Sequence, residues 1–316
     1  MMITLIPRIN PNEDEYLEVL RKIKREGTRR KGRNGITTAI FAHQMRFDLQ
    51  KNFPLITTKF TAFEVIKAEL LWLLDAGKET GGRLSIAKFN ELMGKPSNAK
   101  NVWTGDQLNF AKKGRAQFEG DCGRIYGAQW RDWKTTEGNS IDQLAKVIRQ
   151  LKEDPFMRYH VVNAWNPGEL DDMCLPPCHM KMQFFVRPSH RRDKKMYLDT
   201  SMDQRSCDMF LGEPFNIASY AMLNHMVAQC VGMIPGELVI TLEDCHIYLA
   251  GLDAEKKPVW KNGHLKAVNK QLERTPNKGP KLWLNPEIKD IDSFTMDDIR
   301  IIDYKNQGKI GATLLT

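Results

Sequence analysis

The stretch QRSCDMFLGEPFNIASYAML, residues 204–223, decides the fold. It begins as a polar strand end that carries Arg205, Ser206 and Asp208, and it continues as a mostly apolar helix over residues 216–231. Burying an arginine and a carboxylate costs free energy unless both bind something. The apolar flanks argue against a solvated loop, and an arginine beside a serine suits a phosphate group. This junction therefore predicts an anion-binding site between a strand and a helix, within an α+β fold.

Outward from this junction, the hydrophobic pattern predicts further helices and strands. A capping box of Asn12 and Glu15 predicts a helix that ends at Gly27, and Ser140 with Gln143 predicts the start of another. We expect a further helix at residues 62–76 and strands at residues 36–49, 159–165, 180–186, 196–202 and 237–248. Residues 77–120 are polar and poorly periodic, which indicates an inserted surface segment. Since no repeat and no Pro/Gly-rich linker divides the chain, we expect a single domain over residues 1–316.

Composition sets outer bounds on function. The chain has 316 residues, of which 41% are apolar and 27% charged, and its formal net charge is +8. This excludes a disordered or collagen-like chain, and the basic balance favours anionic partners without saying which. The six cysteines lack paired ligand spacing, so we expect no metal. No apolar run reaches the length of a membrane helix and the first residues lack a signal-peptide pattern, so we expect no membrane partner and a reducing, cytoplasmic location.

Pro176-Pro177-Cys178-His179 is the main candidate for covalent chemistry. Two prolines fix the backbone immediately before a cysteine. The alternative interpretation is a buried structural thiol. A nucleophilic thiol needs a nearby cation that lowers its pKa, and Arg205 is the candidate. Because Cys178 and His179 are neighbours on a strand, their side chains point to opposite faces, which disfavours a Cys–His protease dyad.

Several blocks of the chain closely resemble the thymidylate synthase family. In chain order they are Arg33 in a GRNG loop, FPLITTK (53–59), AELLWLL (68–74), RIYGAQWRDW (124–133), NAWNPGEL (163–170), PPCH (176–179), residues 204–223 and DCHIY (244–248). The resemblance implies an α+β fold with a large mixed sheet that packs against helices and forms a homodimer interface. It also implies transfer of a one-carbon unit from 5,10-methylenetetrahydrofolate to C5 of dUMP, giving dTMP and dihydrofolate.

The resemblance assigns roles in this reaction residue by residue. Cys178 would add as a thiolate to C6 of the uracil ring. Glu69 would move protons through ordered water. Asn216 would read uracil, because an amide both donates and accepts hydrogen bonds, whereas family members acting on dCMP carry Asp there. The implied catalytic residues are Cys178, Glu69, Arg205, Asn216, Tyr126, His179 and Asp208.

The resemblance also implies two binding sites. The dUMP site would comprise Arg33, Arg158, Gln204, Arg205, Ser206, Asn216, His246 and Tyr248. The folate site would comprise Trp103, Asp208, Leu211, Gly212, Phe215 and Lys59. Arg158 would reach the phosphate across the homodimer interface, and Tyr159 stands where the family has a second arginine.

Three further departures bear on the product. Leu249-Ala250-Gly251 follows Tyr248 where the family usually has x-Asn-His, and Phe60 and Ala62 differ from the common Arg and His near the folate tail. The chain ends Ala312-Thr313-Leu314-Leu315-Thr316, in place of the apolar pair that seals the family's active site. An exocyclic methylene on C5 takes either a hydride or water, and water exclusion decides which. The alternative function is therefore a dUMP hydroxymethylase that forms 5-hydroxymethyl-dUMP.

A nucleic-acid-binding protein is an alternative from another class. Basic loops at residues 27–35, 111–115 and 187–195 carry excess positive charge. They lack interleaved aromatic residues, so a solvated basic surface is the preferred interpretation. A gel shift with a salt titration would separate the two, because phosphate contacts give a steep salt dependence.

Overall fold

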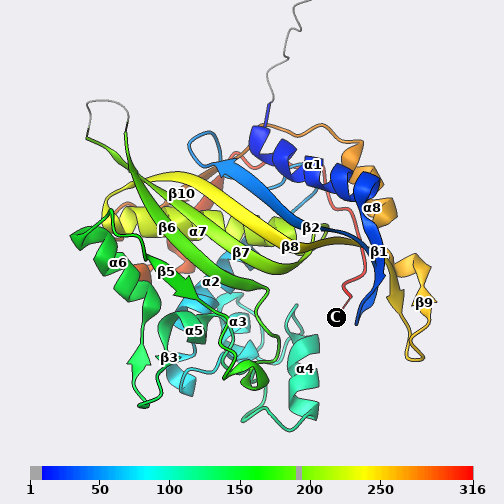
Figure 1. The fold of residues 1–316 in the computed structure, drawn as a ribbon, viewed down its shortest axis with the longest axis horizontal. Coiled ribbons are helices and arrows are strands. Elements are labelled where there is room, and N and C mark those ends of the chain that lie inside the picture. The colour runs from blue at the N-terminus through cyan, green and yellow to red at the C-terminus, as the bar shows by residue number, and fades with distance from the viewer. Residues whose placement is uncertain (1–8, 190–193, 316) are drawn as a thin grey trace, which may run out of the picture.

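The computed structural model describes residues 9–189 and 194–315 and has a mixed α+β fold (Figure 1). Within these residues the main sheet has seven strands in the order β1-β2-β8-β7-β6-β5, with β9 paired to β8. β7 and β8 run parallel and the other pairs run antiparallel. The α+β fold with a large mixed sheet that the sequence predicted is therefore confirmed.

The helices are α1 (Pro11–Glu26), α2 (Phe63–Asp75), α3 (Ile86–Leu92), α4 (Thr104–Lys112), α5 (Gly127–Arg131), α6 (Gln143–Glu153), α7 (Glu213–Val231) and α8 (Leu265–Leu272). The strands of the main sheet are β1 (Thr28–Lys31), β2 (Gly35–Asp48), β5 (Val161–Asn163), β6 (His179–Pro188), β7 (Met196–Asp208), β8 (Ile234–Leu252) and β9 (Pro258–Val259). Two small ribbons pair β3 (Trp133–Lys134) with β4 (Ser140–Ile141) and β10 (Lys281–Leu284) with β11 (Ile299–Ile302).

The core lies between the sheet and the helices behind it in Figure 1. α7 packs against β7, β8 and α2. It is apolar around most of its circumference, as expected of a helix that other elements enclose, and Ile217, Ala221 and Leu223 have no exposed surface. Because α2 carries Glu69 and α7 carries Asn216, this packing places the two side chains on neighbouring helices.

Two predicted helix starts are wrong by two residues. Asn10 caps α1, while Asn12 lies inside the helix and its side chain bonds to the end of β2. Asp142 caps α6, while Ser140 lies in β4. Asn, Asp and Ser are similarly good caps, so a polar run offers several starts. Pro11 selects Asn10, because proline is favoured in the first turn.

The strands beside the cavity described below are longer than the pattern predicted. β7 runs to Asp208 instead of ending at residue 202, and β8 covers Ile234–Leu252 instead of 237–248. The polar side chains of the β7 end face neither the apolar core nor open solvent, and this hides the strand from a hydrophobicity pattern. β5, in contrast, is shorter than the expected 159–165.

Residues 77–120 contain α3 and α4, which the sequence pattern did not predict. Leu84 and Phe89 are buried in the core cluster, and Trp103 is buried beside α2. The segment thus contributes to the core, and its status as an insertion stays a prediction.

Of the expected charged loop at 187–195, residues 190–193 lie outside the described residues, as does Thr316. In the part of the chain that the structure describes, none of the helices combines the length and apolarity that a membrane crossing requires.

Candidate active site

A cavity of about 680 Å³ lies where β7 ends and α7 begins. It brings together most of the residues that the resemblance singled out, from segments far apart in the sequence. These are Arg33, Glu69, Trp103, Tyr126, Cys178, His179, Gln204, Arg205, Ser206, Asp208, Gly212, Asn216, His246 and Tyr248.

Cys178 lies immediately before β6 and contacts Arg205 on the neighbouring strand β7. The backbone N–H of Arg205 donates to the Cys178 carbonyl oxygen at 2.7 Å, and its Nη2 lies 3.8 Å from the Cys178 Sγ. The guanidinium also donates to the carbonyl oxygens of Pro176 and Pro177. Burial raises the pKa of the Cys178 thiol, and the positive charge of Arg205 opposes this rise. The pKa of Cys178 stays above its ordinary value, and Arg205 is the cation that opposes this rise most.

His179 lies apart from this cysteine, between two tyrosines. Its ring centroid is 5.2 Å from that of Tyr126 and 5.2 Å from that of Tyr220. Burial lowers the pKa of His179 to about 4, while its hydrogen bond with Asn216 acts in the opposite direction. A neutral imidazole in this position orients neighbours rather than deprotonating the thiol.

Tyr126 joins the cysteine to the opposite wall of the cavity. Its hydroxyl accepts a hydrogen bond from the Cys178 backbone N–H at 2.8 Å. Its ring packs edge-on against Trp103, whose Nε1 donates to Glu69 Oε1 at 2.7 Å. Burial raises the pKa of Glu69, and the Trp103 hydrogen bond partly offsets this effect. Glu69 is therefore a carboxyl group that exchanges its proton at a pH nearer neutrality than a solvated carboxyl group does.

The end of β8 forms a further wall, and here the structure adds a residue that we missed. Tyr248 and His246 pack ring against ring at 5.1 Å. β8 continues to Leu252, and the chain then turns and pairs back as β9. It returns to Tyr248 at His264, whose backbone N–H donates to the Tyr248 carbonyl oxygen at 2.8 Å. Burial of Asp208 opposes its ionisation, but contacts with His264 and His246 outweigh it and lower the pKa of Asp208. His264 is thus a buried histidine beside Tyr248 and Asp208 that the sequence pattern did not indicate.

The C-terminal segment closes over the same region. His264 Nε2 lies 2.8 Å from the Thr313 carbonyl oxygen, and Asn34 Nδ2 donates to the Leu315 carbonyl oxygen at 3.4 Å. Leu314 and Leu315 line the cavity. Although the sequence of this terminus differs from the family pattern, its apolar side chains lie at the cavity wall.

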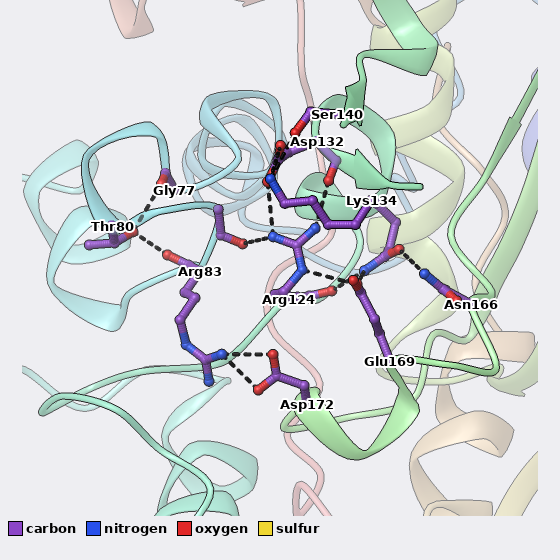
Figure 2. A network of polar contacts seen from close by, with 12 residues as sticks. Gly77, Thr80, Arg83, Arg124, Asp132, Lys134, Ser140, Asn166, Glu169 and Asp172 are labelled. Atoms are coloured by element: carbon purple, nitrogen blue, oxygen red, sulfur yellow. Dashed lines mark hydrogen bonds and ion pairs between the residues drawn. The ribbon is translucent and has the colours of Figure 1, made fainter. Parts of the chain in front are cut away.

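A network of ion pairs holds the loops that lead to the cavity, as Figure 2 shows. Arg124 is nearly buried and binds Asp132 at 2.9 Å and Glu169 at 3.0 Å. Arg83, also nearly buried, binds Asp172 at 2.7 Å. These contacts tie residues 77–120 to the segment before the cysteine, so they fix the wall that carries Tyr126.

Four expected site residues do not line the cavity. Arg158 is exposed on the surface. Lys59 is buried, donates to the Phe210 carbonyl oxygen and lies 3.9 Å from the Phe210 ring centroid, and burial lowers its pKa to about 8. Leu211 and Phe215 are partly buried against the core cluster.

No group of three or more His, Cys, Asp or Glu side chains able to hold a metal ion occurs within residues 9–189 and 194–315. In a comparison with known families, residues 14–316 match a family described as thymidylate synthase.

Proposed function

Because this chain belongs to the thymidylate synthase family, whose activity is one-carbon transfer to dUMP, we propose that it forms dTMP and dihydrofolate from dUMP and 5,10-methylenetetrahydrofolate. The observation that carries the proposal is the 3.8 Å contact between the Cys178 thiol and the Arg205 guanidinium. That contact lies in a cavity that Glu69 and Asn216 also line.

Cys178 supplies the nucleophile. Its thiolate adds to C6 of uracil, and the electron pair of the C5–C6 bond moves toward C5 and O4, so that C5 can attack the one-carbon unit. Arg205 stabilises the thiolate before the addition. The same guanidinium, together with Arg33 and Ser206, binds the dUMP phosphate, because planar guanidinium groups pair well with phosphate oxygens.

Glu69 handles protons at the opposite wall. C5 must lose its proton after it gains the one-carbon unit, and the carbonyl oxygen O4 needs a hydrogen-bond donor while charge develops on it. A buried carboxyl group with a raised pKa serves both needs through ordered water. Asn216 pairs with the N3–H and O4 of uracil, and His246 and Tyr248 hold the ribose.

The folate cosubstrate would lie against Trp103, Gly212 and Asp208, which all line the cavity. Leu314 and Leu315 at the wall support exclusion of water at the stage when the C5 methylene receives hydride. This arrangement favours the synthase over the hydroxymethylase. Leu211 and Phe215 would support the folate site from the core behind it. Lys59 would hold the Phe210 loop in place.

We further propose that the chain acts in the cytoplasm as a homodimer, each subunit being one catalytic domain with an insertion at 77–120. Phe41 on β2 and Phe185 on β6 are 78% and 65% exposed, which is unusual for large aromatic side chains of a central sheet. A second copy of the chain would cover them. Arg158, which is exposed and outside the cavity of its own subunit, would then enter the partner's cavity.

The decisive experiment incubates the protein with dUMP and 5,10-methylenetetrahydrofolate. Dihydrofolate is followed by absorbance and the nucleotide is weighed by mass spectrometry. A methylated nucleotide with one dihydrofolate per turnover is the expected result. A hydroxymethylated nucleotide without dihydrofolate would instead establish the hydroxymethylase, and product from dCMP alone would contradict the role of Asn216.

A further inference from the structure

Glu213 is a buried carboxyl group that contacts the side chain proposed to read the base. It is the first residue of α7 and has no exposed surface. Asn216 lies three residues later on the same helix face, and its Nδ2 donates to Glu213 Oε2 at 3.3 Å. Asn216 lines the cavity, whereas Glu213 lies behind it. Glu213 therefore reaches the cavity through Asn216 and through Gln204, whose side chain also lines it.

The other contacts of this carboxyl group are with neutral side chains. The Cys207 thiol donates to the same Oε2 at 2.9 Å, and the Gln204 side chain also interacts with the carboxyl group. Oε1 has no hydrogen-bond partner among the described residues. Burial raises the pKa of Glu213 to about 7, and the three neighbours only partly oppose this rise. A buried carboxyl group without a cation costs stability, so a function at this position is worth seeking.

An ionised carboxylate accepts hydrogen bonds and donates none, so it can bind only the Nδ2 side of the Asn216 amide. The orientation of the Asn216 amide determines which pyrimidine base it can bind. Uracil presents the O4 acceptor beside the N3–H donor, and cytosine presents the N4–H₂ donor beside an unprotonated N3. Because the two orientations of one amide complement the two bases, an amide that turns freely would accept either base.

We propose that Glu213 is a positioning residue that fixes the amide of Asn216 in the orientation that complements uracil, and thereby excludes cytosine nucleotides. This inference rests on the proposed function, because it takes a pyrimidine nucleotide as the ligand of the cavity. His179 also interacts with the Asn216 side chain, so Glu213 is one of two neighbours of this amide.

The test measures dissociation constants of dUMP and dCMP by calorimetry at pH 8 for the wild type, E213Q, E213L and C207A. Glutamine donates as well as accepts, so it can also bind the amide oxygen of Asn216, and leucine binds neither side. A hydrogen bond to a charged group is worth about tenfold or more in affinity, so we expect the dUMP preference to fall by about tenfold in both Glu213 variants. Cys207→Ala removes the other donor to Oε2 without touching Asn216, and its preference should stay within about twofold of the wild type.

Each outcome has a distinct meaning. An unchanged preference in E213Q, or in E213L if the glutamine variant does not fold, overturns the inference while leaving the proposed function intact. An equal loss of preference in C207A also overturns it, because general loosening of the buried cluster would then explain the effect. A wild-type protein that binds dUMP no better than dCMP contradicts the proposed function and the inference together.

Discussion

The indole Nε1 of Trp103 donates a hydrogen bond to Oε1 of Glu69 at 2.7 Å. Trp103 precedes α4 in the segment 77–120, and Glu69 lies on α2 in the core. This bond is therefore a direct link between the segment 77–120 and the carboxyl group proposed to move protons. It also acts on the pKa of Glu69, which burial raises and the indole lowers.

Replacing Trp103 by Phe should raise the pKa of Glu69 further, because the indole donor is lost while an aromatic ring still fills the space. The acidic limb of the pH profile of kcat should move to higher pH by up to about one pKa unit, the difference that a charged hydrogen bond makes. Steady-state kinetics between pH 5 and 9 measure the shift.

Trp72→Phe is the matched control for Trp103→Phe. Trp72 is also buried and loses an indole donor to a carbonyl oxygen, that of Ser85. The Trp72→Phe variant should lower the free energy of unfolding without moving the pH profile of kcat. If both variants move the acidic limb equally, the Trp103 bond does not set the Glu69 pKa.

Replacing Arg205 by Met should raise the pKa of Cys178, because the guanidinium charge is the strongest influence that opposes burial of the thiol. Alkylation by iodoacetamide at pH 8 reports the thiolate, and its rate at the Cys178 peptide should fall by about tenfold per pKa unit. Arg187→Met is the control, because Arg187 lies on β6 near the far end of the same strand pair and binds Asp199 instead. An unchanged rate in Arg205→Met would remove Arg205 from thiol activation.

Most of the residues singled out from the sequence lie together in one cavity, for a physical reason. Cys178 comes immediately before β6 and Arg205 lies near the end of β7, which pairs with β6, and the residues around each were distinctive enough to recognise. The apolar helix α7, next to β7, was likewise evident from its composition. Local signals sufficed wherever the site residues lay on long, regular elements.

The sequence failed where the position of a side chain depends on a distant segment. His264 reaches Tyr248 only because the chain returns after the hairpin at residues 250–263. Lys59 was expected at the cosubstrate, but burial beneath Phe210 takes it away from the cavity. No local pattern reports such burial.

If the chain is a dimer that shares Arg158, two defective variants should complement each other. Arg158→Ala should bind dUMP about tenfold more weakly, as expected for loss of a charged phosphate contact. Mixing it with Cys178→Ser under conditions of subunit exchange should restore about a quarter of wild-type activity at limiting dUMP, because random pairing leaves one intact site in half of the dimers. Sedimentation of the wild type as a monomer, or a mixture as inactive as its parts, would contradict the shared site.

The nearly buried arginine of Figure 2, Arg124, should contribute more to stability than an exposed arginine outside that figure. Arg124→Ala leaves the carboxylates of Asp132 and Glu169 without their nearly buried partner, and it should cost about 3–5 kcal/mol of unfolding free energy. Arg115→Ala breaks a pair with Asp171 that is largely exposed, and it should cost less than about 1 kcal/mol. Urea unfolding measures both losses of free energy. Similar losses in the two variants would show that burial does not determine how much these ion pairs contribute to stability.

Glu213 should make the wild type less stable as the pH rises. Its pKa is raised by burial from the ordinary 4.5 to about 7, so the native state binds a proton between these values that the unfolded state has released. Stability therefore falls across this window, by about 3 kcal/mol if the full shift is expressed. Glu213→Leu removes the titrating group, so its unfolding free energy should exceed that of the wild type at pH 8 and approach or fall below it at pH 4.5. Urea unfolding at both pH values tests this. If the difference in unfolding free energy between the two proteins does not change with pH, the pKa of Glu213 is the same in the folded and unfolded states. Its neutral neighbours would then stabilise its charge fully.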